Sequence, residues 1–134
     1  MQRDVSLRMA LTIAEAALAE CGVRTSVAVV DRAGRLRVFL QGDGASPHNI
    51  ELARRKAYTA RMFRMTSADF QKRTGPDTPL AGQRNLTDIL ALSGGVPIQI
   101  GKETIGAVGS AGSNLEQDDA CAKAGIAKVA DLLK

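Results

Sequence analysis

Aromatic side chains are scarce in this 134-residue chain, which has three Phe, one Tyr and no Trp. Surfaces for single-stranded nucleic acid usually stack the bases on aromatic rings, so this composition argues against such a surface. The net charge of +4 is not accompanied by a helix-turn-helix, zinc-finger or RNA-recognition signature. We therefore expect no nucleic-acid partner.

Long hydrophobic runs are also missing. No apolar stretch approaches the ~20 residues that a membrane-spanning helix needs. Arg3, Asp4 and Arg8 interrupt the first residues, so no charged-then-apolar leader opens the chain. The expectation is a soluble, cytoplasmic protein without a membrane partner.

Cysteine and histidine are rare as well. Cys21 and Cys121 lie far apart, and each falls in an apolar helical pattern. We expect both to be buried free thiols, consistent with a reducing cytosol. His48 is the only histidine, and no Cys-x-x-Cys-His motif for covalent haem attachment is present. One histidine and scattered acids predict no structural metal site.

The chain nevertheless has the size of one domain, residues 1–134, and 45% of its residues are hydrophobic. Apolar residues repeat at helical spacing between residues 7 and 21, and Gly22 is placed to end that helix. The residues of this apolar stripe are Leu7, Leu11, Ala14, Leu18 and Cys21.

Two β-hairpins are predicted. Residues 26–31 and 36–40 are short apolar runs joined by a loop that ends in Gly34, a residue that tolerates the positive φ of such turns. Residues 97–100 and 104–108 form the second pair. Because hairpins pair their strands antiparallel, we expect an α+β fold with a mostly antiparallel sheet.

Further helices lie between and after the hairpins. Ser46 and Pro47 predict the start of a central helix, along which small alanines suggest close packing. A short helix is expected up to Arg73, capped by Thr66 or Ser67. The capping-box pattern at Ser113 predicts a last helix that runs to the chain end. Residues 75–95 are ambiguous, with a strand or short helix possible at 86–92.

Several strings now resemble one known family in their order and spacing. They are Val29-Val-Asp-Arg-Ala-Gly34, Arg55-Lys-Ala-Tyr-Thr-Ala60, Gly94-Gly-Val-Pro-Ile98, Ile105-Gly-Ala-Val-Gly109 and Glu116-Gln-Asp-Asp-Ala-Cys-Ala122. The chain resembles the GlcG/HbpS-type family, which includes the carboxy-terminal domain of PduO-like proteins. One departure is Gly109-Ser-Ala-Gly-Ser113, where the family often has Gly-Val-Ser-Gly-Gly. If that serine contacts the ligand in relatives, this chain binds a different one.

The resemblance implies a profilin-like or PAS-like fold, with an antiparallel sheet of about five strands and helices packed on it. It also implies homo-oligomers, frequently octamers, and haem binding in several members. Other members sit in catabolic or biosynthetic operons without a settled activity.

Two residues are candidates to hold haem iron. His48 lies at the start of the central helix, where the helix dipole favours the neutral imidazole that iron binds. The more ordinary interpretation is a surface or cap-adjacent histidine, and a general base is a further alternative to the iron ligand. Tyr58 offers a phenolate as an alternative axial ligand, although a lone helical Tyr more often packs its ring.

The central helix supplies the other predicted ligand-binding residues. Arg55, Lys56 and Arg61 offer cations for haem propionates or a substrate carboxylate. Lys56 shares a partly apolar stripe with Thr59 and Phe63, so we expect it either to snorkel or to lie at the lip of a pocket between this helix and the sheet. The predicted ligand-binding set is His48, Arg55, Lys56, Tyr58, Thr59 and Phe63.

Two functions of different classes remain open. The first is a non-enzymatic binding protein that holds haem or a carboxylated metabolite. The second is a small cofactor-independent enzyme, an isomerase, hydratase or lyase acting on a hydroxy or carbonyl metabolite, with His48 as the catalytic acid–base. A third reading is an accessory or sensory subunit that works through its surface.

Overall fold

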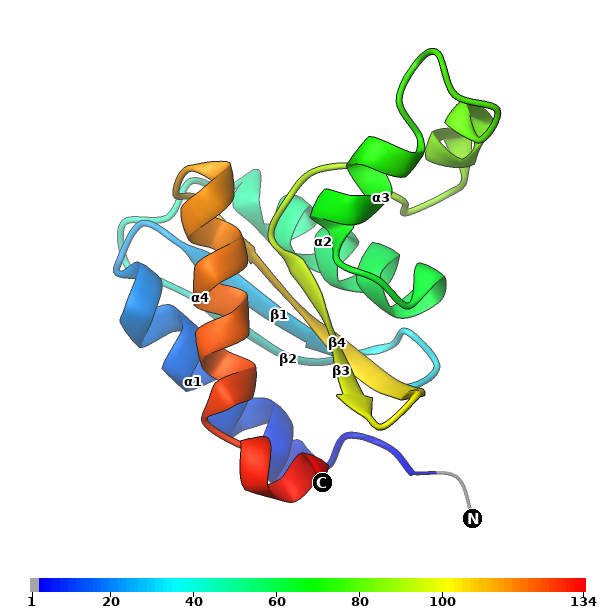
Figure 1. Ribbon diagram of the computed structural model, residues 1–134. Helices are drawn as coiled ribbons and strands as arrows, with labels where there is room; N and C mark the ends of the chain where they lie inside the picture. Colours follow the sequence, from blue (N-terminus) through cyan, green and yellow to red (C-terminus); the bar gives the residue numbers. More distant parts are fainter. Residues whose placement is uncertain (1–2) are drawn as a thin grey trace.

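Within the described part of the chain, the sheet has four antiparallel strands. The computed structural model describes residues 3–134, and the strand order is β2-β1-β4-β3 (Figure 1). The strands are β1 Ser26–Val30, β2 Leu36–Gln41, β3 Gly95–Ile100 and β4 Glu103–Ala111. Both predicted hairpins are present, and the pairing of β1 with β4 joins them. The α+β class and the antiparallel sheet are therefore confirmed. The expected count of about five strands is wrong, because residues 86–92 form turns and irregular chain.

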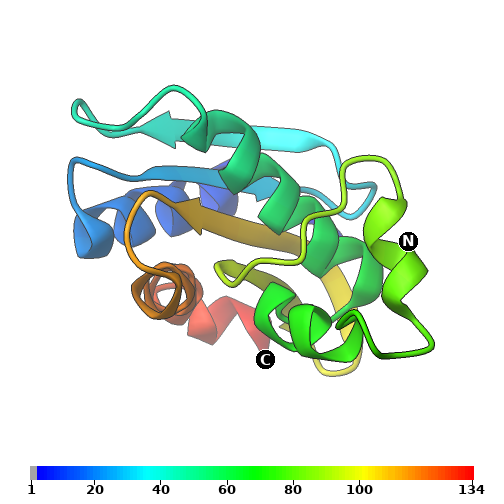
Figure 2. The ribbon, with the colours of Figure 1, turned by 90° about the horizontal axis from the view of Figure 1, so that it is seen from above.

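Helices cover both faces of the sheet (Figure 2). On one face lie α1 Leu7–Cys21 and α4 Leu115–Ala127, which pack against each other. On the other lies α2 Asn49–Phe63, followed by the short α3 Ser67–Arg73. Two 3₁₀ turns complete the chain, η1 Ala81–Asn85 and η2 Ala130–Leu133. No helix in the described part is both long enough and apolar enough to cross a membrane.

The two faces of the sheet carry different cores. Strand residues alternate between faces, so Val27 and Val29 of β1 point toward α1 and α4 while Ala28 and Val30 point toward α2. The α1/α4 core is built mainly from branched aliphatic side chains. The α2 core is almost entirely alanine, from residues 28, 53, 57, 60, 107 and 111. The prediction that the alanines of the central helix mark close packing is confirmed.

Glycine makes this close approach possible. A Cβ built at Gly109 would overlap the carbonyl oxygen of Ala53, and one built at Gly95 would overlap that of Lys56. Both glycines lie on strands under α2, and neither has a positive φ. Their role is therefore to let the backbone of α2 rest directly on the sheet.

The predicted helix ends need correction at three places. The first helix has the predicted bounds, but Leu7 and Leu11 of its expected buried stripe are 56% and 40% exposed. The buried face of α1 is instead Ala10, Ile13, Ala14 and Ala17. The central helix begins at Asn49, after a turn over residues 46–48, and so Ser46 is not its cap.

The cap of α3 is as predicted, whereas the cap and the end of α4 need correction. Thr66 caps α3 as predicted, through a hydrogen bond from the amide of Asp69. The last helix is capped by Asn114, whose side chain accepts from the amide of Gln117, and not by Ser113. It ends at Ala127 and gives way to η2 instead of running to the chain end.

The expectation of two free thiols is wrong. Cys21 at the end of α1 and Cys121 in α4 form a disulfide that spans 100 residues of sequence. The bond is possible because α1 and α4 lie side by side on one face, which brings the two Cα atoms within 5.6 Å. Structural disulfides occur mainly in oxidising compartments, so the two cysteines do not support the expectation of a reducing cytosol.

Candidate functional site

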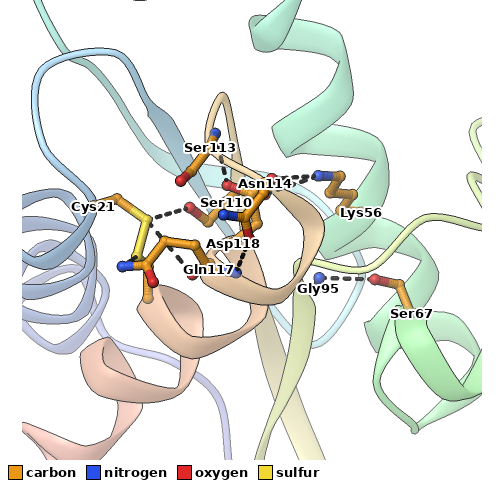
Figure 3. Close-up of polar contacts among 10 residues, drawn as sticks. Cys21, Lys56, Ser67, Gly95, Ser110, Ser113, Asn114, Gln117 and Asp118 are labelled. Carbon is orange, nitrogen blue, oxygen red and sulfur yellow. Dashed lines mark hydrogen bonds and ion pairs between the residues drawn. A yellow bond between two sulfur atoms is a disulfide. The ribbon is translucent and has the colours of Figure 1, made fainter.

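A buried polar cluster joins the two helical layers at one end of the sheet (Figure 3). The Nζ atom of Lys56 lies 3.2 Å from Oδ2 of Asp118 and donates to the carbonyl oxygen of Ser110 at 3.1 Å. Both charged side chains are only 2% exposed. Lys56 comes from α2 and Asp118 from α4, so this ion pair passes around the end of β4 from one face of the sheet to the other.

Each member of the cluster is held by further contacts. Oδ1 of Asp118 accepts from the amide of Ser113, which ties the loop after β4 to the first turn of α4. A Cβ at Gly94 would come within 3.0 Å of Nζ of Lys56, so the chain passes directly beside the ammonium. The hydroxyl of Ser110 lies 3.5 Å from Sγ of Cys21, which places the disulfide at the edge of the cluster.

Burial lowers the pKa of Lys56 from its ordinary value of 10.5, and this effect outweighs the opposing attraction of Asp118. The ammonium is thus held in an environment that favours its neutral form more than water does. It donates two hydrogen bonds inside the protein, one to the carboxylate of Asp118 and one to the carbonyl of Ser110.

The structure therefore corrects the expected position of Lys56. The residue neither snorkels nor lies at the lip of a pocket, because its side chain is enclosed and ion-paired. Sequence reasoning missed Asp118, because its local pattern does not show that it pairs with a residue of another helix. The available signal was its place in the family-like string that opens the last helix.

Two other predicted ligand-binding residues, Thr59 and Phe63, make internal contacts. Thr59 is fully buried, and its hydroxyl donates to the carbonyl of Arg55 and accepts from the amide of Leu90 at 2.8 Å. Phe63 packs on Phe70 of α3 with ring centroids 4.4 Å apart. The first contact secures the loop after η1, and the second joins α2 to α3.

Tyr58 lies on a different side of α2 from Lys56. Its ring, together with Met62, covers Gly34 in the β1–β2 turn, where an added Cβ would fall 2.9 Å from the Tyr58 ring. Lys56 instead faces Gly94 and α4. Since residues two apart on a helix point about 160° away from each other, the chain does not bring Tyr58 and Lys56 into one pocket.

Two predicted residues do share an accessible face of α2. His48, Leu52 and Arg55 follow at spacings of four and three residues, which places them on one stripe of the helix. His48 is exposed, and the side chain of Arg55 is 43% exposed. Nε of Arg55 is 3.4 Å from Oε1 of Glu51 but has no hydrogen-bond partner among the described residues.

The imidazole of His48 makes no hydrogen bond to any residue in the range 3–134. A catalytic histidine is normally oriented by a second group that fixes its tautomer. The described contacts supply no such group. The predicted acid–base role of His48 stays a prediction that no contact supports.

The sequence of this chain matches the model of a known protein family. Residues 5–127 match the family model described as "Haem degrading protein HbpS-like". The chain belongs to this HbpS-like family. The resemblance seen in the sequence strings is thereby confirmed.

Individual relatives are similar to this HbpS-like chain in sequence or in fold. A curated protein of Citrobacter freundii, described as an uncharacterized 15.0 kDa protein in the dhaT-dhaS intergenic region, is 31% identical over 106 residues. That match covers 78% of this chain and 75% of the relative. A crystal structure of a double mutant of Streptomyces reticuli HbpS has a TM-score of 0.89 and 32% identity, and covers 95% of this chain and 88% of that one.

A third relative was solved with a ligand. The crystal structure described as the PduOC:Heme complex has a TM-score of 0.85 and 25% identity to the HbpS-like chain. The match covers 92% of this chain and 93% of that one.

Proposed function

We propose that this HbpS-like chain is a small-ligand-binding protein whose ligand is haem, with His48 as the iron ligand. The observation that carries the proposal is its membership of the HbpS-like family together with its likeness to the haem complex of PduOC. The site residues are inferred from the geometry of this chain alone.

The accessible stripe of α2 supports His48 over Tyr58. The nitrogen atoms of His48 are free of hydrogen bonds within the described chain, whereas the ring of Tyr58 is packed over Gly34. Leu52, one turn after His48, offers partly exposed apolar surface for the macrocycle. Arg55 lies about 10 Å further along the helix than His48, a suitable separation between iron and a propionate.

The residues present fit haem in part. An available imidazole, an apolar side chain and a partly exposed arginine are aligned on one helix face. The aromatic side chains do not form a wall there, because Phe63 stacks on Phe70 and Tyr58 covers a turn. We propose that a second copy of the chain supplies the other wall. Haem bound in this way would have its iron coordinated by His48 and be open to ligand exchange or redox chemistry.

The test is a haemin titration of the purified protein, followed at the Soret band. We expect a saturable shift for the wild type, a changed band position for His48→Ala and weaker binding for Arg55→Gln. Tyr58→Phe is the matched control, because it keeps the packed ring and removes only the hydroxyl. A featureless rise that is the same for wild type and His48→Ala would disprove the proposal, and a change confined to Tyr58→Phe would move the iron ligand to Tyr58.

We also propose that the chain forms a homo-oligomer, with the octamer as the expected form. Leu7 and Leu11 of α1 are 56% and 40% exposed, which leaves an apolar stripe on the outside of the helix. Light scattering coupled to gel filtration measures the assembly directly. We expect Leu7→Glu to reduce the molar mass and Leu86→Glu, at an exposed loop leucine, to leave it unchanged. A monomeric wild type would contradict this proposal. It would also mean that no second copy of the chain supplies the other wall of the haem site.

A further inference from the structure

Three segments meet at the end of the molecule away from the buried polar cluster (Figure 1). They are the end of α2, the β1–β2 turn and the β3–β4 turn. Nε of Arg61, in the last turn of α2, donates to the carbonyl oxygen of Arg32 in the β1–β2 turn. An open cleft of about 440 Å³ lies between these segments. Its lining residues are Arg32, Arg61, Met62, Arg64, Lys102, Glu103 and Thr104, and we call it the arginine cleft.

The carboxylates around the arginine cleft are already engaged. Glu103 forms an ion pair with Arg32. Asp31 is buried and is paired with Arg35, 3.2 Å away. Oδ1 of Asp4 accepts from the backbone amide of Arg32 at 2.8 Å. Glu103 and Asp31 are therefore already paired with other arginines, whereas Asp4, held by backbone amides, offsets part of the charge near Arg61 from beyond ion-pair distance.

Three cations of the cleft remain without an acidic partner. Within residues 3–134, no carboxylate lies within ion-pair distance of Arg61, Arg64 or Lys102. Burial lowers the pKa of Arg61, and the neighbouring charges of Arg32 and Arg64 lower it further, while Asp4 and Asp31 oppose this shift without reversing it. A positive cluster of this kind is relieved when an anion enters it.

The guanidinium of Arg61 is held in place for such a contact. Its Nε–H is used by the carbonyl of Arg32, which anchors the side chain to the turn. The two terminal nitrogens make no hydrogen bond to the described chain, and this edge of a guanidinium matches the two oxygens of a carboxylate or phosphate. Arg64 and Lys102 add charge without requiring a particular geometry.

We propose that the arginine cleft binds a small multivalent oxyanion, with Arg61 as its principal contact. The shared chemistry is that of a polycarboxylate or a phosphate ester, and the cleft is too small and too open to enclose a macrocycle. The inference does not depend on haem binding. His48 lies at the other end of α2 and Arg55 near its middle, and neither lines the arginine cleft, so the two sites are separate.

The test is isothermal titration with citrate and with inorganic phosphate, at neutral pH and constant ionic strength. We expect saturable binding of at least one probe by the wild type and about tenfold weaker binding by Arg61→Gln, the loss expected for a charge-assisted contact. Arg61→Lys keeps the charge but loses the planar pair of donors, so its affinity should lie between the two. Lys102→Gln changes an exposed turn residue of the same cleft and should weaken binding without affecting folding.

Arg73→Gln is the matched control, because Arg73 is an exposed arginine at the end of α3 outside the cleft. It removes the same charge and should leave affinity within about twofold of the wild type. Absence of saturable heat with both probes, or equal loss in Arg61→Gln and Arg73→Gln, would overturn the proposal.

Haemin titration of Arg61→Gln distinguishes a free small oxyanion from the carboxylates of bound haem as the ligand of the arginine cleft. Unchanged haem binding supports a free small ligand, and loss of haem binding with unchanged citrate and phosphate binding overturns the separate site.

Discussion

Lys56 and Asp118 lie on helices that cover opposite faces of the sheet, yet their charged atoms are 3.2 Å apart in the interior. The lysine side chain reaches its partner by passing Gly94 and the carbonyl of Ser110. A charge that loses its partner in such a place cannot regain water without opening the structure. The pair therefore couples the position of α2 to that of α4.

Removing one member of this pair should strongly destabilise the fold. We expect Lys56→Met to lower the free energy of unfolding by about 3–5 kcal/mol, because it leaves Asp118 buried and unpaired. Asp118→Asn keeps the acceptor for the amide of Ser113 but removes the charge. The double variant should cost less than the sum of the single changes. Urea unfolding of all four proteins measures the coupling, and additive losses would show that the two groups do not interact.

The pair should also make stability depend on alkaline pH. Since burial lowers the pKa of Lys56 in the folded state, the unfolded chain binds more protons between that pKa and 10.5. The contribution of Lys56 to stability should therefore rise with pH in this window and be constant below it. The informative quantity is the difference between wild type and Lys56→Met, in which the other titrating groups cancel. A difference that falls with rising pH would contradict the inferred direction.

The disulfide between Cys21 and Cys121 should contribute substantially to stability. It closes a long loop and joins the two helices of one layer, so reduction should lower the free energy of unfolding by about 2–5 kcal/mol. Unfolding by urea with and without a reducing agent tests this. The variant lacking both cysteines should be insensitive to the reducing agent. Thiol titration of the unreduced, unfolded wild type should find no free thiol, and two reactive thiols would show that the bond does not form.

Because α2 lies in close contact with the sheet, substitution of Gly109 should destabilise the fold. A methyl group at this position would overlap backbone atoms of α2, so Gly109→Ala should destabilise the protein by about 1–3 kcal/mol. Gly82 offers a matched control, because a Cβ there would meet nothing within 4 Å. Thermal unfolding should show a large loss for Gly109→Ala and little change for Gly82→Ala. Similar effects at both positions would mean that the helix can move away from the sheet.

Local patterns predicted the elements well but their surroundings poorly. Both hairpins and four helices lie where apolar periodicity and turn residues place them. The exposure of Leu11 was not predictable, because periodicity reports a stripe of apolar residues and not what covers it. The segment 86–92 was ambiguous for the same reason. Its backbone is held by a side chain from elsewhere, through the amide of Leu90 and the hydroxyl of Thr59.

The candidate site illustrates the same limit. The sequence could rank His48, Arg55 and Lys56 as residues able to carry ligand chemistry, and the family-like strings marked the segments that contain them. It could not separate the accessible stripe of α2 from the face that meets Asp118, because that depends on how the helix is rotated against the sheet.

By itself, then, the amino-acid sequence determined the family, the α+β class, the hairpins and the order of the helices. The hairpins and helices depend on interactions between residues that are near neighbours in the chain, and the family is recognised from short strings of residues. Tertiary structure alone decided the four-strand sheet, the disulfide, the burial of Lys56 and the gathering of Arg32, Arg61 and Lys102 around one cleft. Each of these joins residues far apart in the sequence, and their energies depend on burial and distance, which exist only once the layers have packed.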